Sequence, residues 1–197
     1  MNRITFNNTD RKPKYMRKIA FINGKGGSGK TTAAAILLLA LRDAGKQITI
    51  RDTDPQRTFA RFAETLEIET TPDDPAFEII DTPPRLDHKL LGRIADEVDR
   101  IIIPARPGPA DLWTAQETAE FLREIGAAKK ARLLWNCVRP GTLLSRDLDD
   151  KARQIGLKAI MTPLSLRESY QHAFLVGWTG LDAEAKDEAR RMAEEII

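Results

Sequence analysis

A glycine-rich stretch near the start of this 197-residue chain has the residue types and spacing that phosphate binding needs. Residues 23–32 read Asn-Gly-Lys-Gly-Gly-Ser-Gly-Lys-Thr-Thr. Gly24, Gly29, Lys30 and Thr31 match the pattern G-x-x-x-x-G-K-[ST], whose glycines let successive backbone N–H groups point at phosphate oxygens. In that pattern the lysine reaches the β- and γ-phosphates and the next hydroxyl holds magnesium. The stretch therefore predicts a nucleotide-phosphate site with Lys30 and Thr31 in these roles.

The flanking sequence supplies the elements that would position this loop. An apolar run predicts a strand over residues 17–23, and an Ala- and Leu-rich run predicts a helix from Thr31 to Ala44 that Gly45 ends. Because this helix is apolar nearly all round, we expect it to be buried against a sheet. Its first turn would direct unpaired N–H groups and the positive end of its dipole toward the phosphates.

The remaining periodicity predicts an α/β fold. Further strands are expected over residues 47–51, 77–81, 98–104, 131–137 and 157–161, and helices from Arg57 to Leu66, Ala110 to Ile125, Leu143 to Ile155 and from about Asp182 onward. Alternating strands and helices after a phosphate loop indicate a doubly wound, mostly parallel sheet with helices on both faces. We expect residues 17–197 to form one domain. Residues 1–16 are interpreted as a flexible basic tail or a start assigned too early, with a DNA-touching arm as the alternative.

Lys25, just after the first glycine, is the residue that extends this motif to one found in a known protein family. Residues 25–32, Lys-Gly-Gly-Ser-Gly-Lys-Thr-Thr, resemble the deviant Walker A motif K-G-G-x-x-K-T-T of the ParA/MinD ATPases. In that family the first lysine reaches across a dimer to the partner's nucleotide, and the resemblance gives Lys25 this role. The alternative is a solvated lysine at a permissive position. The resemblance also assigns nucleotide binding to Gly26, Gly27, Ser28, Gly29, Lys30, Thr31 and Thr32.

Two aspartate-containing turns extend the resemblance. Asp52-Thr53-Asp54-Pro55-Gln56 resembles the D-x-D-P-Q switch I segment of ParA proteins, which implies that Asp54 orients the attacking water and Asp52 lies near magnesium through water. Attack on a γ-phosphate needs such an acceptor, because the water must be held in line. A turn that caps the next helix is compatible with both roles. Asp81-Thr82-Pro83-Pro84 resembles Walker B in the form D-T-P-P, with Asp81 accepting from a magnesium-bound water.

The sequence does not assign a single role to three polar residues near predicted strand ends. Asn136 matches an asparagine that several relatives use to hydrogen-bond adenine, and a strand-end turn residue is the alternative. Arg51 occupies a position that is aliphatic in the family, and the sequence gives it no role. Arg106, in a loop that resembles the family's I-P-x-x-P loop, faces either phosphate or solvent.

Composition excludes several classes of protein. One cysteine, Cys137, cannot form an intrachain disulfide, and with His88 and His172 alone there is no Cys/His cluster for zinc or iron–sulfur ligation. A reductase like the nitrogenase iron protein is excluded on the same ground. No apolar stretch is long enough to span a bilayer, and the closing helix lacks the basic face of a MinD-like membrane helix. These features predict a cytoplasmic protein without a membrane partner.

The resemblance implies a function as well as a fold. The short ParA proteins that segregate plasmids are most similar, which implies that ATP, with Mg²⁺, closes a homodimer that binds DNA without sequence preference and is nucleoid-associated. A ParB-like or small centromere-binding protein would stimulate hydrolysis and release the dimer during plasmid or chromosome partition. The alternatives are a ParA-like ATPase that positions another cargo, such as a conjugation complex, and a P-loop small-molecule kinase or ligase. The candidate DNA-facing residues are Arg139, Arg146, Arg153, Lys158 and Arg167.

Overall fold

The computed structural model describes residues 16–84 and 88–197, so the expected tail at 1–16 lies outside the described residues except for Met16. A five-stranded sheet has the order β2-β3-β1-β4-β5, and each neighbouring pair is parallel. The strands are β1 (Arg17–Phe21), β2 (Ile48–Asp52), β3 (Phe77–Asp81), β4 (Arg100–Ala105) and β5 (Ala131–Trp135). The predicted parallel α/β sheet is confirmed.

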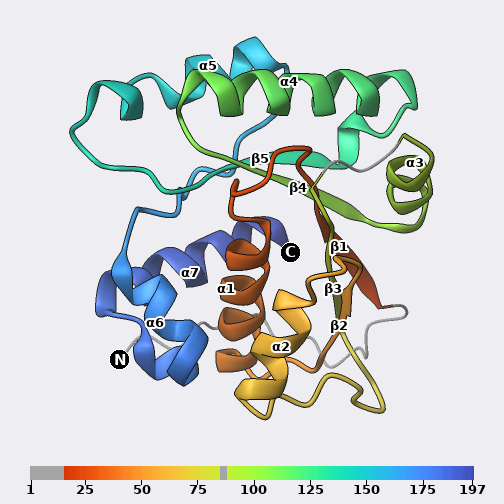
Figure 1. Cartoon of the computed structure of the whole chain (residues 1–197), viewed down its shortest axis with the longest axis vertical. Helices are drawn as coiled ribbons and strands as arrows, with labels where there is room; N and C mark the ends of the chain where they lie inside the picture. Colours follow the sequence, from red (N-terminus) through yellow and green to blue (C-terminus); the bar gives the residue numbers. More distant parts are fainter. Residues whose placement is uncertain (1–15, 85–87) are drawn as a thin grey trace.

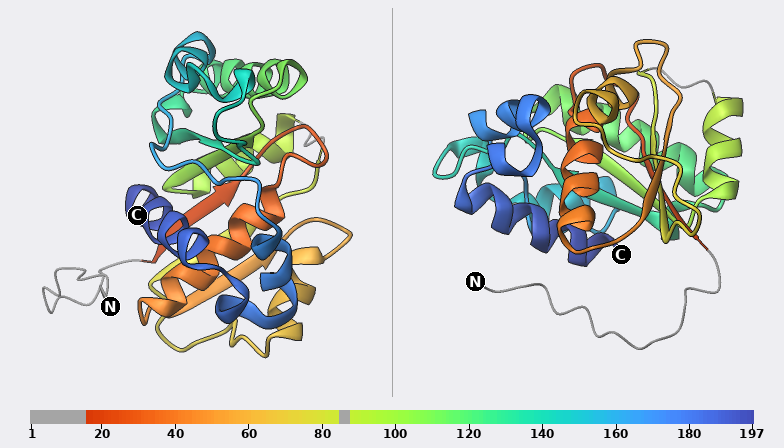
Figure 2. Two further views of the ribbon diagram at one scale, coloured as in Figure 1. Left: turned by 90° about the vertical axis from the view of Figure 1, so that its left-hand side faces the viewer. Right: turned by 90° about the horizontal axis from the view of Figure 1, so that it is seen from below.

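Helices cover both faces of this sheet (Figures 1 and 2). On one face lie α1 (Lys30–Asp43), α2 (Thr58–Thr65), α6 (Glu168–Val176) and α7 (Ala183–Ile196). On the other lie α3 (His88–Glu97), α4 (Pro109–Glu124) and α5 (Leu148–Ile155). Short 3₁₀ turns are η1 (Ala128–Lys130), η2 (Leu143–Ser145) and η3 (Gly177–Gly180).

The period-2 alternation of strand side chains divides the core into two layers. Ile19 and Phe21 of β1 pack with α1, whereas Ala20 and Ile22 pack with the layer of α3, α4 and α5. Residues 33–41 of α1 are all buried because α1 lies between the sheet, α2, α6 and α7. The apolar circumference of this helix thus has a partner on nearly every side, as its sequence predicted.

Strand register brings the two aspartate turns together. Asp81 of β3 is paired with Phe21 of β1 on one side and with Asp52 of β2 on the other. Because parallel strands end at the same edge, the loop after β1 and both aspartate turns meet there, at the place where open α/β sheets bind ligands. The sheet therefore positions the candidate site by register alone.

Two secondary-structure predictions need correction, and one helix was missed. Residues 157–161 form a single bridge, Leu133 to Ala159, and no strand, because Glu195 accepts the N–H groups of Met161 and Thr162 and draws the chain away from β5. The helix predicted from Leu143 to Ile155 is interrupted by Asp147, which has a left-handed φ of 56°. The sequence also did not identify α3. Among the described residues, no helix has the length and apolarity needed to cross a membrane.

Candidate nucleotide-binding site

The loop after β1 is shaped by two glycines and tied down by two asparagines. Gly27 and Gly29 have left-handed φ values of 75° and 91°, which other residues adopt at a cost. A Cβ on Gly29 would lie 1.8 Å from Asn136 Nδ2, so the close approach of this side chain requires glycine. Asn23 is buried, donates to Pro104 O at 2.6 Å and accepts from Lys25 N at 2.9 Å. Asn23 thereby joins the loop to β4, a role that the sequence analysis missed.

Lys30, the first residue of α1, extends back across the loop. Its Nζ donates to Asn23 O at 3.1 Å and to Lys25 O at 3.4 Å, and the side chain is buried. Burial lowers the pKa of Lys30, and the negative charges of Asp81 and Asp54 oppose that shift. The ammonium group thus lies inside the curl of the loop, where a phosphate would provide stronger acceptors than the two carbonyls.

Thr31 and Asp81 form a direct contact at the edge of the sheet. Thr31 Oγ1 donates to Asp81 Oδ2 at 2.6 Å, and Thr82 N donates to Asp81 Oδ1 at 3.1 Å. Burial raises the pKa of Asp81 to about 6, and nearby Asp52 adds to that increase. At neutral pH this buried carboxylate is charged at an energetic cost, which a nearby cation would offset. Thr32 is half-buried in the same first turn.

The turn after β2 is organised by its own carboxylates. Asp52 Oδ1 accepts from Asp54 N at 3.0 Å, and Asp52 Oδ2 accepts from Ala60 N in the first turn of α2 at 2.9 Å. Asp54 Oδ1 accepts from Gln56 N at 2.9 Å, which leaves its other oxygen without a hydrogen bond within the described residues. Asp52 therefore holds the turn and supports α2, whereas Asp54 keeps an oxygen available for a further contact.

Lys25 is held within its own chain by an acidic residue that the sequence analysis missed. Lys25 Nζ lies 2.5 Å from Oδ2 of Asp111, in the first turn of α4. The side chain of Lys25 is 36% exposed and that of Asp111 is 8% exposed. Asp111 Oδ1 is buried without a hydrogen bond in the described part of the chain. The available signal was an acidic residue at the start of the helix that follows β4, because that helix begins at the same sheet edge as the loop.

Asn136, just after β5, holds the phosphate loop by a hydrogen bond. Its Nδ2 donates to Ser28 O at 2.9 Å, and its Oδ1 accepts from Cys137 N at 2.9 Å. Asn136 and Ser28 are both buried. In this structure the amide therefore binds backbone atoms on both sides, and the contact with adenine stays a prediction.

The two arginines without a sequence role have different surroundings. Arg51 Nε lies 3.1 Å from Glu78, and its Nη2 lies 2.9 Å from Glu97. Lys18 also approaches Glu78, at 3.6 Å, so Arg51 belongs to a charge cluster on the sheet face that includes α3. Arg106 is exposed, and no ion pair involves it within the described residues.

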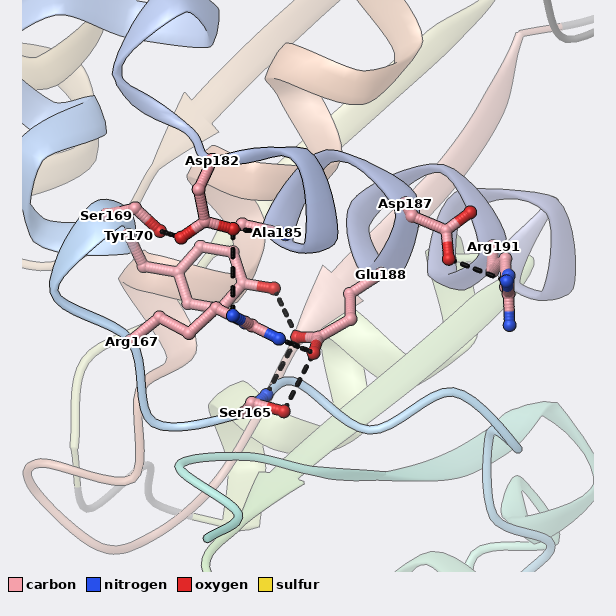
Figure 3. A network of polar contacts seen from close by, with 9 residues as sticks. All are labelled: Ser165, Arg167, Ser169, Tyr170, Asp182, Ala185, Asp187, Glu188 and Arg191. Carbon is pink, nitrogen blue, oxygen red and sulfur yellow. Dashed lines mark hydrogen bonds and ion pairs between the residues drawn. The ribbon is translucent and has the colours of Figure 1, made fainter. Parts of the chain in front are cut away.

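Two acidic residues of α7 fix the segment that follows residue 160. Glu188 accepts from Ser165 N and Oγ at 2.9 and 2.7 Å, from Arg167 Nη2 at 2.9 Å and from Tyr170 OH at 2.6 Å (Figure 3). Burial opposes the charge of Glu188, but these hydrogen bonds outweigh it and lower its pKa. Asp182 accepts from Ser169 and Ala185 at the start of α7. The segment is thus anchored beside Val138, which pairs with Ser165.

The donor set fits magnesium bound together with a nucleotide. No group of three or more His, Cys, Asp or Glu side chains able to hold a metal ion occurs in residues 16–84 and 88–197. Magnesium in nucleotide sites takes one or two protein oxygens and draws the rest from phosphates and water. The Thr31 hydroxyl and the buried Asp81 carboxylate provide oxygens of this type at the loop.

Comparison with known proteins shows the family of this chain. The family described as "CobQ/CobB/MinD/ParA nucleotide binding domain" matches residues 19–174. The maintenance of carboxysome distribution protein A of Gloeobacter kilaueensis is 31% identical, over 92% of this chain and 94% of its own length. Protein ParA of Rhizobium radiobacter is 24% identical, over 82% of this chain and 84% of its own length.

The solved structures agree with these relatives in fold. A putative plasmid partition protein of Borrelia burgdorferi B31 bound to AMPPNP superimposes with a TM-score of 0.70 at 15% identity, over 92% of this chain and 98% of that one. Taken with the phosphate loop and the aspartates that register places beside it, the family match identifies the chain as a member of the CobQ/CobB/MinD/ParA nucleotide-binding family, whose ParA and MinD members are nucleotide-binding ATPases.

Proposed function

We propose that this chain is an ATPase of the ParA type, which dimerises on ATP binding, binds DNA without sequence preference and distributes a cargo at the expense of ATP. The observation that carries the proposal is the placement of Lys25. It lies on the phosphate loop, partly exposed, while Lys30 of the same loop is buried. A second lysine at the outer rim of a site that already has its own phosphate-binding lysine can bind the nucleotide of another subunit by exchanging Asp111 for its phosphates.

The chemistry assigned to the site is hydrolysis of the γ-phosphate. The loop N–H groups and Lys30 would bind the phosphates, and the Thr31 hydroxyl with the Asp81 carboxylate would hold Mg²⁺. Magnesium, when bound, neutralises charge that develops on the phosphate oxygens. Asp54, with one oxygen free of hydrogen bonds in the described structure, orients the water that attacks γ-phosphorus as the bond to the β-phosphate oxygen breaks. Asp52 shapes the turn that presents Asp54.

Dimerisation is also supported by an exposed tryptophan on α4, the helix that carries Asp111. Trp113, two residues after Asp111 on α4, is 66% exposed. Aromatic side chains are enriched at protein–protein interfaces, so an exposed tryptophan on this helix supports a protein contact there. ATP favours the dimer if Lys25 of each subunit binds the other's nucleotide, and cleavage of the γ-phosphate removes that preference.

Two kinds of cargo are compatible with this ATP-dependent dimerisation. Plasmid or chromosome partition requires a ParB-like or small centromere-binding partner, and the likeness to Protein ParA supports it. Positioning of a protein assembly requires an adaptor on that assembly, and the 31% identity to a carboxysome distribution protein over nearly the whole chain supports this second candidate. Transport of either cargo would require a dimer that binds the nucleoid. A measurement of DNA binding therefore tests both candidate functions.

The first experiment measures binding of the purified chain to arbitrary duplex DNA with ATP, with ADP and without nucleotide, at two salt concentrations. We expect binding with ATP alone, and we expect it to weaken steeply with salt because phosphate contacts release counterions. ATP binding without DNA binding in any nucleotide state would contradict the proposal. A small-molecule kinase or a positioner that does not use DNA would then be favoured.

The role of Lys25 has its own test. Lys25→Ala should still bind ATP, because Lys30 and the loop backbone remain, but it should not dimerise. Light scattering with ATP and Mg²⁺ measures the dimer, and the exposed Lys89→Ala serves as a matched control on α3. A dimer of unchanged affinity in the Lys25 variant would return Lys25 to the role of a solvated lysine.

A further inference from the structure

A basic recess lies at the amino end of β5, at the opposite end of the sheet from the phosphate loop. It has a cavity volume of about 390 Å³ and lies between η1, the start of β5 and the turn after α5. We use the name basic recess for its three ionisable lining residues, Lys129, Arg132 and Lys158. All three are cationic, so the recess has the charge that an anionic ligand requires.

The position of Arg132 makes this recess more than a set of surface lysines. Arg132 Nη1 donates to Lys129 O at 3.1 Å and to Ala131 O at 2.7 Å, which fixes the guanidinium on backbone carbonyls. Neither Nε nor Nη2 of Arg132 makes a hydrogen bond within the described residues. A fixed guanidinium with free donors is the arrangement that binds phosphate oxygens well.

The positive charges in and beside the basic recess have no acidic ion-pair partner among the described residues. Arg100, the first residue of β4, lies close enough to act on Arg132, and burial together with this like charge lowers the pKa of Arg132. No ion pair involves Arg100, Lys129, Arg132 or Lys158 in the part of the chain that the structure describes. By contrast, Arg153 pairs with Asp150, and Arg167 pairs with Glu188. Of the basic residues that the sequence singled out, Lys158 therefore retains a free charge where Arg153 and Arg167 do not.

From these contacts we propose that the basic recess binds backbone phosphates of duplex DNA. This inference rests on the proposed function, which requires a DNA surface but does not locate it. The described lining residues include no aromatic side chain, so the recess offers no stacking platform for unpaired bases and suits contact with phosphates alone. Lys129 and Lys158 are exposed and line the same recess as Arg132, so all three can contact one stretch of phosphodiester backbone.

The recess and the phosphate loop lie at opposite ends of β5, so ATP can act on DNA binding only through the dimer. Asn136, which supports the loop, follows the carboxyl end of β5, whereas the recess is at the amino end of the same strand. DNA and nucleotide therefore do not compete for one site. In the proposed dimer the two phosphate loops face each other, so the two recesses lie at its outer ends and can hold two segments of one long DNA, which adds avidity that a single chain lacks.

The test uses the full chain with both exposed lysines removed, Lys129→Ala with Lys158→Ala. With ATP and Mg²⁺ at about 0.1 M salt, we expect affinity for an arbitrary duplex to fall roughly tenfold or more, and the salt slope to fall by about one unit per lost phosphate contact. Binding of a fluorescent ATP analogue and the ATP-dependent dimer should be unchanged. Arg61→Ala with Arg93→Ala removes the same charge from exposed positions on α2 and α3 and should have a much smaller effect.

Each other outcome is informative. DNA binding by the lysine variant equal to wild type, or an equal loss in the Arg61 and Arg93 control, would overturn the recess while leaving the proposed function intact. Failure of the wild-type chain to bind DNA in every nucleotide state would overturn both. A competition experiment with inorganic phosphate, compared with chloride at equal ionic strength, distinguishes DNA phosphates from a free anion as the ligand of the recess. We expect inorganic phosphate to displace little DNA. Displacement of DNA by low phosphate concentrations would make the recess a site for a free anion instead.

Discussion

The two ends of the sheet differ in how their charged side chains are arranged. At the carboxyl end, the residues of the candidate nucleotide site contact one another, with Lys25 on Asp111 and Thr31 on Asp81. At the amino end of β4 and β5, Arg100, Arg132 and Lys158 form no ion pair within the described residues. A site for a metal–nucleotide complex has to position both signs of charge, whereas a surface for a polyanion needs one sign. The difference indicates that the two ends serve different ligands.

The largest expected effect is at the buried lysine of the carboxyl end. Lys30→Ala should abolish nucleotide binding at attainable ATP concentrations, with a loss in affinity of roughly a hundredfold or more, because Lys30 would donate to both the β- and the γ-phosphate and each charge-assisted hydrogen bond contributes about 1.5–3 kcal/mol. Titration with a fluorescent ATP analogue measures it, with Lys89→Ala as the exposed control. A Lys30→Ala variant that keeps the wild-type affinity for ATP would mean that the carboxyl end of the sheet is not the nucleotide site.

Asp54→Ala separates binding from hydrolysis at the same end. We expect ATP to bind within about twofold of wild type and hydrolysis to fall by roughly 10²–10⁴, the range for loss of a positioned acid–base group. Phosphate release under single-turnover conditions is the measurement, and Asp73→Ala in the exposed loop before β3 is the control. Hydrolysis at the wild-type rate would remove Asp54 from the mechanism.

Glu188→Gln tests a carboxylate whose partners belong to the fold instead of to a ligand. Because the hydrogen bonds to Glu188 hold its pKa below the ordinary value of 4.5, its charge contributes stability above that pH, and this stability is lost as pH falls through the folded pKa. We expect the variant to be less stable than wild type by roughly 2 kcal/mol at neutral pH.

Urea unfolding at pH 7 and at about pH 3.5 measures that difference, which should begin to shrink below pH 4.5 because the carboxyl group of the unfolded wild-type chain then binds a proton that the folded one does not. Glu194→Gln changes an exposed residue of the same helix and should have little effect at either pH. A loss of stability that is independent of pH would mean that the charge of Glu188 is not what anchors the segment after residue 160.

The smallest effect concerns the ion pair of Lys25. Asp111→Asn should free Lys25 for the nucleotide of a second subunit and lower the ATP concentration for half-maximal dimerisation by about two- to fivefold, since a partly exposed ion pair contributes up to about 1 kcal/mol. Light scattering across an ATP titration measures the midpoint, and Glu124→Gln, which removes an exposed carboxylate from the far end of the same helix, serves as a control. An unchanged or higher midpoint would mean that Asp111 does not compete for Lys25.

The sequence predicted the loop, the parallel sheet and the two aspartate turns because these depend on local patterns. Glycine spacing, apolar runs and residues at strand ends are visible in the chain itself, and parallel strands then bring their carboxyl ends together. It did not predict Asp111 or Asn23 in the site, since each contacts a residue far from it along the chain or depends on the approach of another strand. The strand expected at 157–161 was wrong for a similar reason, because a distant side chain, Glu195, takes its N–H groups.

By itself, then, the sequence determined that a phosphate loop precedes a buried helix and that Asp52, Asp54 and Asp81 follow strands. Only the tertiary structure decided which charges are compensated. It placed Arg51 beside Glu78 and Glu97, closed Glu188 within a hydrogen-bond network and left the basic recess without an acidic partner in the described chain. The physical reason is that Coulomb energy depends on separation in space and on burial, and neither quantity follows from position along the chain.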